Sequence, residues 1–144
     1  MAVLPQQHED GGTRPPAPPP QLLLVSCPES VRAARDFARE FVAYHVPGAA
    51  EEYVENVRLI VSELVTNSVR YGTEPGDSVL LVLAVADSYV RVEVRDPMRR
   101  RPCFRGASDE RGRGRGLFIV AALAARWGVA ERPFGKAVWA QVAR

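Results

Sequence analysis

Two side chains with complementary chemistry, Glu63 and Asn67, lie four residues apart in a segment with helical periodicity. At this spacing both side chains lie on one face of an α-helix, one turn apart. A carboxylate can take a proton from a nucleophile, and an amide oxygen can coordinate a hard cation such as Mg²⁺. The pair therefore indicates a catalytic base, Glu63, next to a cation ligand, Asn67. From periodicity alone, a solvated pair on an exposed helix face is the alternative.

A glycine-rich turn, Gly112-Arg113-Gly114-Arg115-Gly116, comes immediately before an apolar stretch that starts at Leu117. Free N–H groups and a partial positive charge attract anions to the N-terminus of a helix, and glycine lets the backbone come close to phosphate oxygens. The turn is therefore a candidate phosphate-binding segment, in which Arg115 could also hold phosphate charge. A flexible Arg-Gly loop is an equally ordinary interpretation of the same residues.

Asp96 ends a strand-like segment, immediately before residues 97–113, which are rich in Arg, Pro and Gly and have no periodicity. A carboxylate in this position can accept a hydrogen bond from the exocyclic amine of a base and so select that base. An aspartate that caps the turn before Pro97 is equally common. Residues 97–113 are predicted to form a long loop of a kind that is often functional.

Apolar periodicity predicts the elements that must position these groups. Helices are expected at residues 28–45, with Ser26 as the cap, at residues 50–71, ended by Gly72, and at residues 114–125. Strands are expected at residues 22–25, 79–86, 90–95, 127–132 and 136–142. This order indicates an α+β fold, a two-layer sandwich with three helices on one face of a largely antiparallel or mixed sheet.

Composition limits what else the chain can do. Its 144 residues fit one domain, which we place at residues 21–144, after a disordered tail at residues 1–20 that holds six of the 12 prolines. A formal charge of +2 favours neither nucleic acid nor a membrane as the main partner. Cys27 and Cys103 lack metal-ligand spacing, and no apolar run is long enough to cross a bilayer. We therefore expect a cytoplasmic protein with reduced cysteines and no signal peptide.

Taken in order, three stretches resemble motifs of the GHKL superfamily of ATPases, which share the Bergerat nucleotide-binding fold. Residues 60–72 (IVSELVTNSVRYG) resemble its N box, and residues 114–120 (GRGLFIV) with 126–128 (RWG) resemble its second glycine box and the helix after it. Residues 135–140 (GKAVWA) resemble its final strand. The resemblance covers residues 21–144, and within the superfamily it extends to the small bacterial anti-sigma-factor serine/threonine kinases.

The resemblance implies ATP and Mg²⁺ as cofactors and gives each candidate residue a role. Glu63 would be the general base, Asn67 would bind the Mg²⁺ that bridges the phosphates, and Asp96 would contact the adenine amine. The phosphate site would comprise Gly112, Gly114, Arg115, Gly116 and Leu117, covered by residues 97–113 as a lid. Two departures stand out. Related sequences have spaced glycines where this chain continues Pro97-Met98-Arg99, and they often have a hydroxyl residue where it has Ala137 after Lys136.

By the same resemblance, the chain would be a regulatory kinase in a partner-switching system. Its partners would be a sigma factor and a STAS-type anti-anti-sigma antagonist, phosphorylated on serine or threonine, and the chain would form a homodimer. A non-catalytic module that binds a protein in an ATP-dependent way is the alternative, favoured by the missing glycines after Asp96. A less favoured one is nucleic-acid binding through Arg99-Arg100-Arg101, Arg105 and the Arg-Gly turn.

Overall fold

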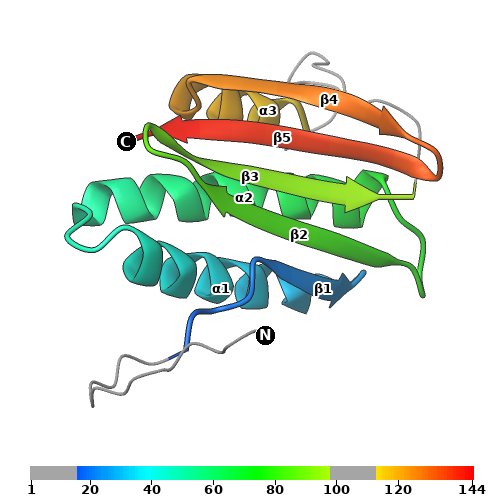
Figure 1. The fold of residues 1–144 in the computed structure, drawn as a ribbon. Helices are drawn as coiled ribbons and strands as arrows, with labels where there is room; N and C mark the ends of the chain where they lie inside the picture. Colours follow the sequence, from blue (N-terminus) through cyan, green and yellow to red (C-terminus); the bar gives the residue numbers. More distant parts are fainter. Residues whose placement is uncertain (1–15, 98–112) are drawn as a thin grey trace, which may run out of the picture.

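The computed structural model describes residues 16–97 and 113–144, with only the backbone described at residues 113–116. Most of the predicted tail and of the predicted lid therefore lie outside the described residues. The helices are α1 (Glu29–His45), α2 (Glu51–Tyr71) and α3 (Arg113–Leu123). The strands are β1 (Gln21–Val25), β2 (Ser78–Val85), β3 (Tyr89–Asp96), β4 (Arg126–Arg132) and β5 (Gly135–Ala143) (Figure 1).

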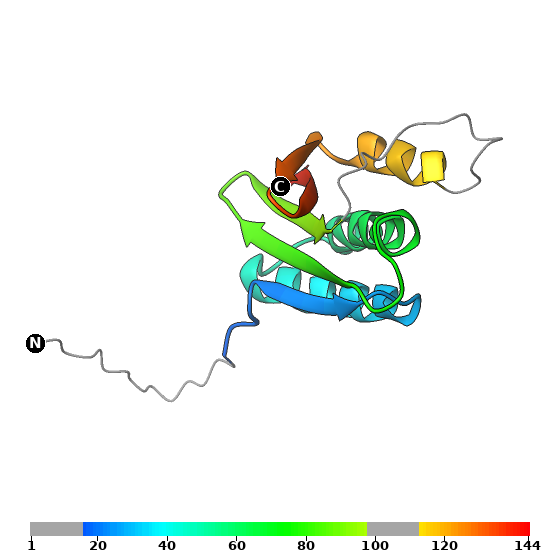
Figure 2. The same cartoon turned by 90° about the vertical axis from the view of Figure 1, so that its right-hand side faces the viewer.

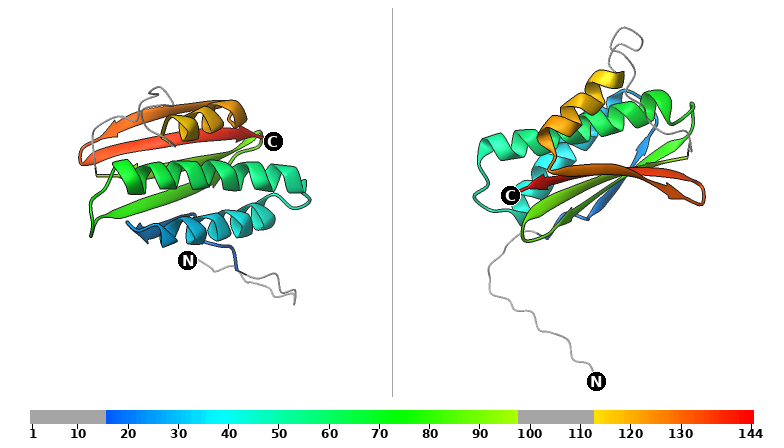
Figure 3. Two further views of the ribbon diagram at one scale, coloured as in Figure 1. Left: turned by 180° about the vertical axis from the view of Figure 1, so that it is seen from behind. Right: turned by 90° about the horizontal axis from the view of Figure 1, so that it is seen from above.

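The strands form one sheet in the order β1-β2-β3-β5-β4, and every neighbouring pair is antiparallel. Figure 3 shows the three helices on one face of this sheet, with α2 between α1 and α3. Figure 2 shows the same layers from the side, with α3 next to α2. The predicted α+β two-layer sandwich is confirmed, and all the described strand pairs are antiparallel rather than mixed.

Alternation along β3 shows how the sheet separates a buried face from an open one. Val90, Val92 and Val94 are fully buried beneath the helices, whereas the residues between them are only partly buried on the other face. This period of two places Asp96, the last residue of β3, on the buried face. A carboxylate at the end of an apolar row needs polar partners, because burying an unpaired charge is costly.

The core lies between the helices and the buried face of the sheet. α2 contributes most of it, through a stripe at helical spacing whose side chains are buried. Tyr53, on the same helix, is partly exposed and donates its hydroxyl proton to the Val142 carbonyl at 2.8 Å. The buried stripe of α2 consists of Val54, Val57, Ile60, Val61, Leu64, Val65 and Ser68.

The predicted cap of the first helix is wrong. α1 begins at Glu29 with Pro28 at the cap position, and no side chain makes a capping hydrogen bond. Ser26 lies two residues before that position, too early in the chain to reach the free N–H groups of the first turn. Its hydroxyl instead contacts the Thr73 hydroxyl at 2.5 Å, which ties the start of α1 to the segment after α2.

The third helix is shorter than predicted. It ends at Leu123 rather than Ala125, because the Ala125 N–H donates to the Gln141 carbonyl of β5 and the chain enters β4 at Arg126. The remaining elements agree with the predicted ranges to within one residue at each end. None of the described helices is long and apolar enough to span a lipid bilayer.

Candidate functional site

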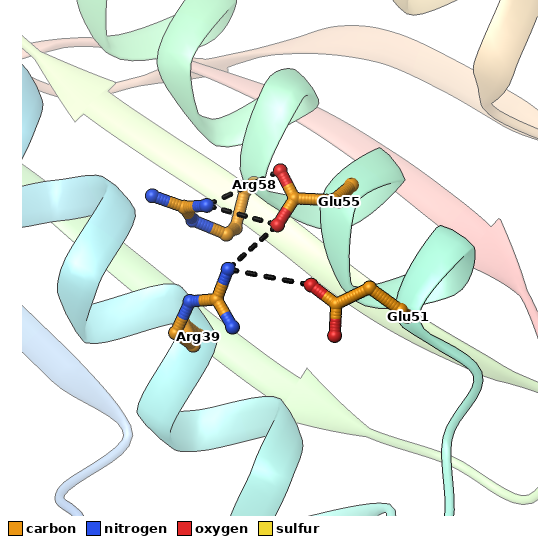
Figure 4. A network of polar contacts seen from close by, with 4 residues as sticks. All are labelled: Arg39, Glu51, Glu55 and Arg58. Atoms are coloured by element: carbon orange, nitrogen blue, oxygen red, sulfur yellow. Dashed lines mark hydrogen bonds and ion pairs between the residues drawn. The ribbon is translucent and has the colours of Figure 1, made fainter.

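Glu63 and Asn67 lie on the flank of α2 that faces away from α1. The contacts of Arg58 and Glu55 identify the flank that faces α1. Arg58 bonds Glu55, and Glu55 pairs with Arg39 of α1 (Figure 4). Arg58 and Asn67 are nine residues apart, or two and a half helical turns, so their side chains point to opposite sides of α2. Since α2 packs between α1 and α3, Asn67 and Glu63 lie on the α3 side.

Glu63 is a partly buried carboxylate, and burial raises its pKa above the ordinary value for glutamate. Within the described part of the chain, no cation forms an ion pair with it. Desolvation without a compensating positive charge makes a carboxylate a better proton acceptor near neutral pH. Asn67 is also partly buried, one turn further along the same face. The structure therefore places a partly buried carboxylate and an amide one turn apart on the same flank of α2.

Asp96 lies below this flank, and its carboxylate is enclosed. Ser68, the residue after Asn67, donates its hydroxyl proton to Oδ2 at 2.8 Å. Lys136 of β5 donates from Nζ to Oδ1 at 2.9 Å and to Oδ2 at 3.1 Å. Only 1% of the Asp96 side chain and 6% of the Lys136 side chain are exposed. α2, β3 and β5 thus meet at one buried, hydrogen-bonded ion pair.

Two glycines make room for Asp96. A Cβ atom on Gly72, which ends α2, would lie 2.4 Å from Asp96 Oδ2. Gly135, just before Lys136, has a φ of +128°, and its Cβ would lie 1.9 Å from the Asp96 carbonyl oxygen. Both contacts are impossible for a real Cβ, so any side chain at either position would displace Asp96 or the turn that carries it. The Gly72 backbone thus lies against the carboxylate, and the Gly135 backbone lies against the carbonyl of the same residue.

The first turn of α3 contains Gly114 and Gly116, as the phosphate-site prediction requires of a helix N-terminus. Gly112 and the rest of the predicted lid lie outside the described residues, and only the backbone of Arg115 is described. The Leu117 side chain is fully buried, which leaves its backbone as the part that can meet a ligand. The Arg-rich segment behind the nucleic-acid alternative, residues 99–105, also lies outside the described residues.

Sequence reasoning missed three members of this cluster. Sequence patterns assign no role to Ser68 or Lys136 and identify Gly72 only as a helix end. The strand register decides the last point: Lys136 lies opposite Asp96, whereas Ala137 lies opposite Arg95 and so on the other face of the sheet. The residue next to Asp96 at this position is therefore Lys136, and not Ala137. Counting the alternation back from Val142 along β5 could have identified it.

The fold is a two-layer α+β sandwich, with a Glu/Asn pair on its central helix and a glycine-containing helix start beside that pair. This combination is typical of a nucleotide-binding, ATPase-like domain. The sequence matches the family described as "Histidine kinase-like ATPase domain" over residues 24–142, so the chain belongs to that family. No curated protein matches the chain. Membership of this family identifies the chain as an ATP-binding, ATPase-like domain.

The two ends of this site differ in how well they suit ATP. At the phosphate end, a partly buried carboxylate without an ion-pair partner among the described residues lies next to an amide, which fits a proton acceptor beside a Mg²⁺ ligand. At the base end, the fit fails. Both oxygens of Asp96 already accept protons from Lys136 or Ser68, and almost none of the side chain is exposed. Asp96 does not offer a carboxylate oxygen to an exocyclic amine in this structure.

Proposed function

We propose that the chain is an ATP-dependent protein serine/threonine kinase of the anti-sigma-factor type, acting in a partner-switching system. The single observation that carries this proposal is the position of Glu63, a partly buried carboxylate on the α3 side of α2, one turn from Asn67. A phosphoryl acceptor with a serine or threonine hydroxyl needs a base that removes its proton, and the raised pKa suits Glu63 to that task.

The roles of the residues follow from their chemistry. ATP would supply the γ-phosphoryl group when bound, with Mg²⁺ balancing the charge of the phosphates. Asn67 Oδ1 would be the neutral oxygen ligand for that cation, and the first turn of α3 would offer backbone N–H groups to the phosphates. Glu63 accepts the hydroxyl proton of the acceptor protein at a carboxylate oxygen.

The proposed partners are a sigma factor, bound and withheld from transcription, and a STAS-type anti-anti-sigma antagonist, phosphorylated on a serine or threonine. A homodimer is the proposed assembly. The cytoplasm is the proposed compartment, because all of these partners act there.

Phosphotransfer to candidate antagonists from the same genome tests the proposal, with Glu63→Gln as the informative variant. Loss of a general base lowers the rate by about 10²- to 10⁴-fold. Glu55→Gln is the matched control: it is the same chemical change on the same helix, but on the flank that faces α1. We expect Glu55→Gln to retain the wild-type rate. Equal rates for wild type and Glu63→Gln, or no transfer to any antagonist, would contradict the kinase proposal.

One observation favours a second function, a module that binds its partner in an ATP-dependent way without transferring phosphate. The Asp96 carboxylate, expected to bind the base, is instead engaged by Lys136, so one contact on which the kinase proposal relies is missing. Partner affinity measured with and without Mg-ATP distinguishes the two functions. Nucleotide-dependent binding with no phosphorylated product supports the module, whereas partner affinity that is unchanged by ATP excludes it.

A further inference from the structure

The only lysine of the chain is buried next to the carboxylate expected to bind the base. The sequence contains 19 basic residues, and all the others are arginines. Lysine is rarely buried unless it is paired, and Lys136 is 6% exposed and paired with Asp96. A lysine on the buried face of the β3–β5 strand pair therefore needs a specific explanation.

We propose that Lys136 is a specificity-determining residue that takes the place of the exocyclic amine of the base on Asp96. The nucleotide site therefore binds its ligand through the phosphates and does not prefer adenine over other bases. This role deepens the proposed function and rests on it, because it concerns the base end of the same site. It names a substrate class, Mg²⁺-bound polyphosphates and nucleoside triphosphates, in place of ATP alone.

The first step of the argument is the geometry of the donors. The Lys136 ammonium reaches both oxygens of Asp96, at 2.9 and 3.1 Å, and the Ser68 hydroxyl reaches Oδ2 at 2.8 Å. An exocyclic amine would need one of these same oxygens. Because only 1% of the Asp96 side chain is exposed, the amine could bind only by displacing Lys136 or Ser68.

The second step is the relative strength of the competing donors. Both donors would bond to an ionised acceptor, but the Lys136 ammonium also brings the positive charge that compensates the buried carboxylate, whereas the neutral amine of adenine brings none. Displacing it would also leave two buried charges without their partners. A neutral amine therefore cannot replace the Lys136 ammonium at this carboxylate without a net loss of free energy.

The third step is that Asp96 has no room to turn toward another donor. Gly72 lies against the carboxylate, where an added Cβ would be only 2.4 Å from Oδ2, and the Gly135 backbone lies against the Asp96 carbonyl. The carboxylate is therefore fixed in the orientation that Lys136 uses. Base selection by Asp96 is absent unless Lys136 is removed.

Calorimetric titration of the full chain with Mg-ATP, Mg-GTP and Mg-tripolyphosphate tests this inference. We expect dissociation constants for ATP and GTP within about threefold of each other for the wild type. In Lys136→Met, which keeps the aliphatic stem and removes the ammonium, Asp96 becomes available to the amine. ATP affinity should then rise at least about tenfold over GTP, as expected when a site gains a hydrogen bond from one ligand and not from the other.

Arg126→Met is the matched control, since it also removes one positive charge, but from an exposed residue of β4. Arg126 lies opposite Gln141, five residues along β4 from Glu131, which lies opposite Lys136. It should leave the ATP/GTP ratio unchanged. A second readout uses the single lysine: with ¹⁵N-labelled lysine, one Nζ signal reports on the ion pair. That signal should respond equally to ATP, GTP and tripolyphosphate.

The outcomes separate this inference from the proposed function. ATP binding more than tenfold tighter than GTP binding by the wild type would overturn the role of Lys136 and leave the nucleotide site intact. An Nζ signal moved by ATP alone would do the same, and both measurements need no variant to fold. No binding of any of the three ligands by the wild type, with ATP binding restored in Lys136→Met, would support Lys136 as the block and count against the proposed function. No binding by either protein would overturn both.

Discussion

Lys136 lies directly opposite Asp96 in the β3–β5 ladder, and its Nζ contacts both carboxylate oxygens beneath the end of α2. This one pair joins three elements, because Ser68 of α2 bonds the same carboxylate. The ion pair therefore connects parts of the fold, and it also lies next to the proposed nucleotide site. Its structural part can be measured by unfolding, separately from any ligand.

Removing Lys136 alone should be strongly destabilising. Lys136→Met leaves the Asp96 carboxylate buried without its ammonium partner, although Ser68 still donates to it, and breaking a buried ion pair on one side costs about 3–5 kcal/mol. The double variant Asp96→Asn/Lys136→Met removes both charges and should recover most of that loss. Urea unfolding of the two single variants and the double variant gives the coupling free energy. A coupling below about 0.5 kcal/mol would show that the pair is not a unit.

Gly72→Ala tests the close approach of the α2 end to Asp96. The added Cβ would meet Oδ2 at 2.4 Å, and the carboxylate cannot retreat because Ser68 and Lys136 hold it. Overpacking of this kind costs about 1–3 kcal/mol. Gly76→Ala is the control: its Cβ meets nothing within 4 Å, and its φ of +95° gives a backbone cost of about 1 kcal/mol. In urea unfolding, Gly72→Ala combined with Asp96→Ala should be less destabilised than the sum of the two changes. Strict additivity would contradict the contact.

The fold was predictable from the sequence because its elements carry clear periodicity. The valines of β3 alternate with charged residues, and the apolar stripe of α2 recurs every three or four positions, so both elements were found with nearly correct ends. Ser26 was misassigned because its type suits a helix cap, while the cap position itself depends on where Pro28 starts the helix. Residue type alone does not fix a boundary.

The candidate site was predictable only where its residues are close in sequence. Glu63 and Asn67 share a helix face, so their spacing was sufficient. Asp96 and Lys136 are 40 residues apart, and their contact depends on the register of β3 with β5, which no local pattern fixes. A register shifted by one residue would place Ala137 opposite Asp96, with no side-chain donor for its carboxylate.

The exposed charge network between α1 and α2 should contribute little, in contrast to the buried pair. Arg39 bonds Glu51 at 3.4 Å and Glu55 at 2.7 Å, and Arg58 bonds Glu55 at 2.9 Å (Figure 4). Glu55 is exposed, and its pKa is lowered chiefly by the hydrogen bond from Arg58. Surface pairs are screened by salt, so Glu55→Gln should shift Tm by less than about 2 °C in 0.15 M salt. A larger loss of Tm that persists in 1 M salt would contradict this prediction.

Glu63→Gln should raise stability at neutral pH while it removes the proposed base. Burial raises the pKa of Glu63 in the folded chain, so its carboxyl group contributes stability that is fully present below the unfolded pKa and is lost as pH rises through the folded pKa. At pH 7.5 the ionised, partly desolvated carboxylate therefore opposes folding, and a neutral amide of the same shape does not. Allowing for the partial exposure of this side chain, we expect Tm to rise by about 1–3 °C.

The sign of this effect has an internal control. The pKa of Glu55 is lowered rather than raised, so its carboxylate contributes stability above its unfolded pKa, and that stability is lost as pH falls through the folded pKa. Glu55→Gln at pH 7.5 should therefore leave Tm unchanged or slightly lower, opposite in direction to Glu63→Gln. At a pH well below both the ordinary glutamate pKa of about 4.3 and the lowered pKa of Glu55, both carboxyl groups are protonated and both differences from wild type should shrink. Thermal unfolding of the three proteins across this range is the measurement. A Glu63→Gln gain that does not depend on pH would show that shape, and not desolvation of the charge, sets the stability at this position.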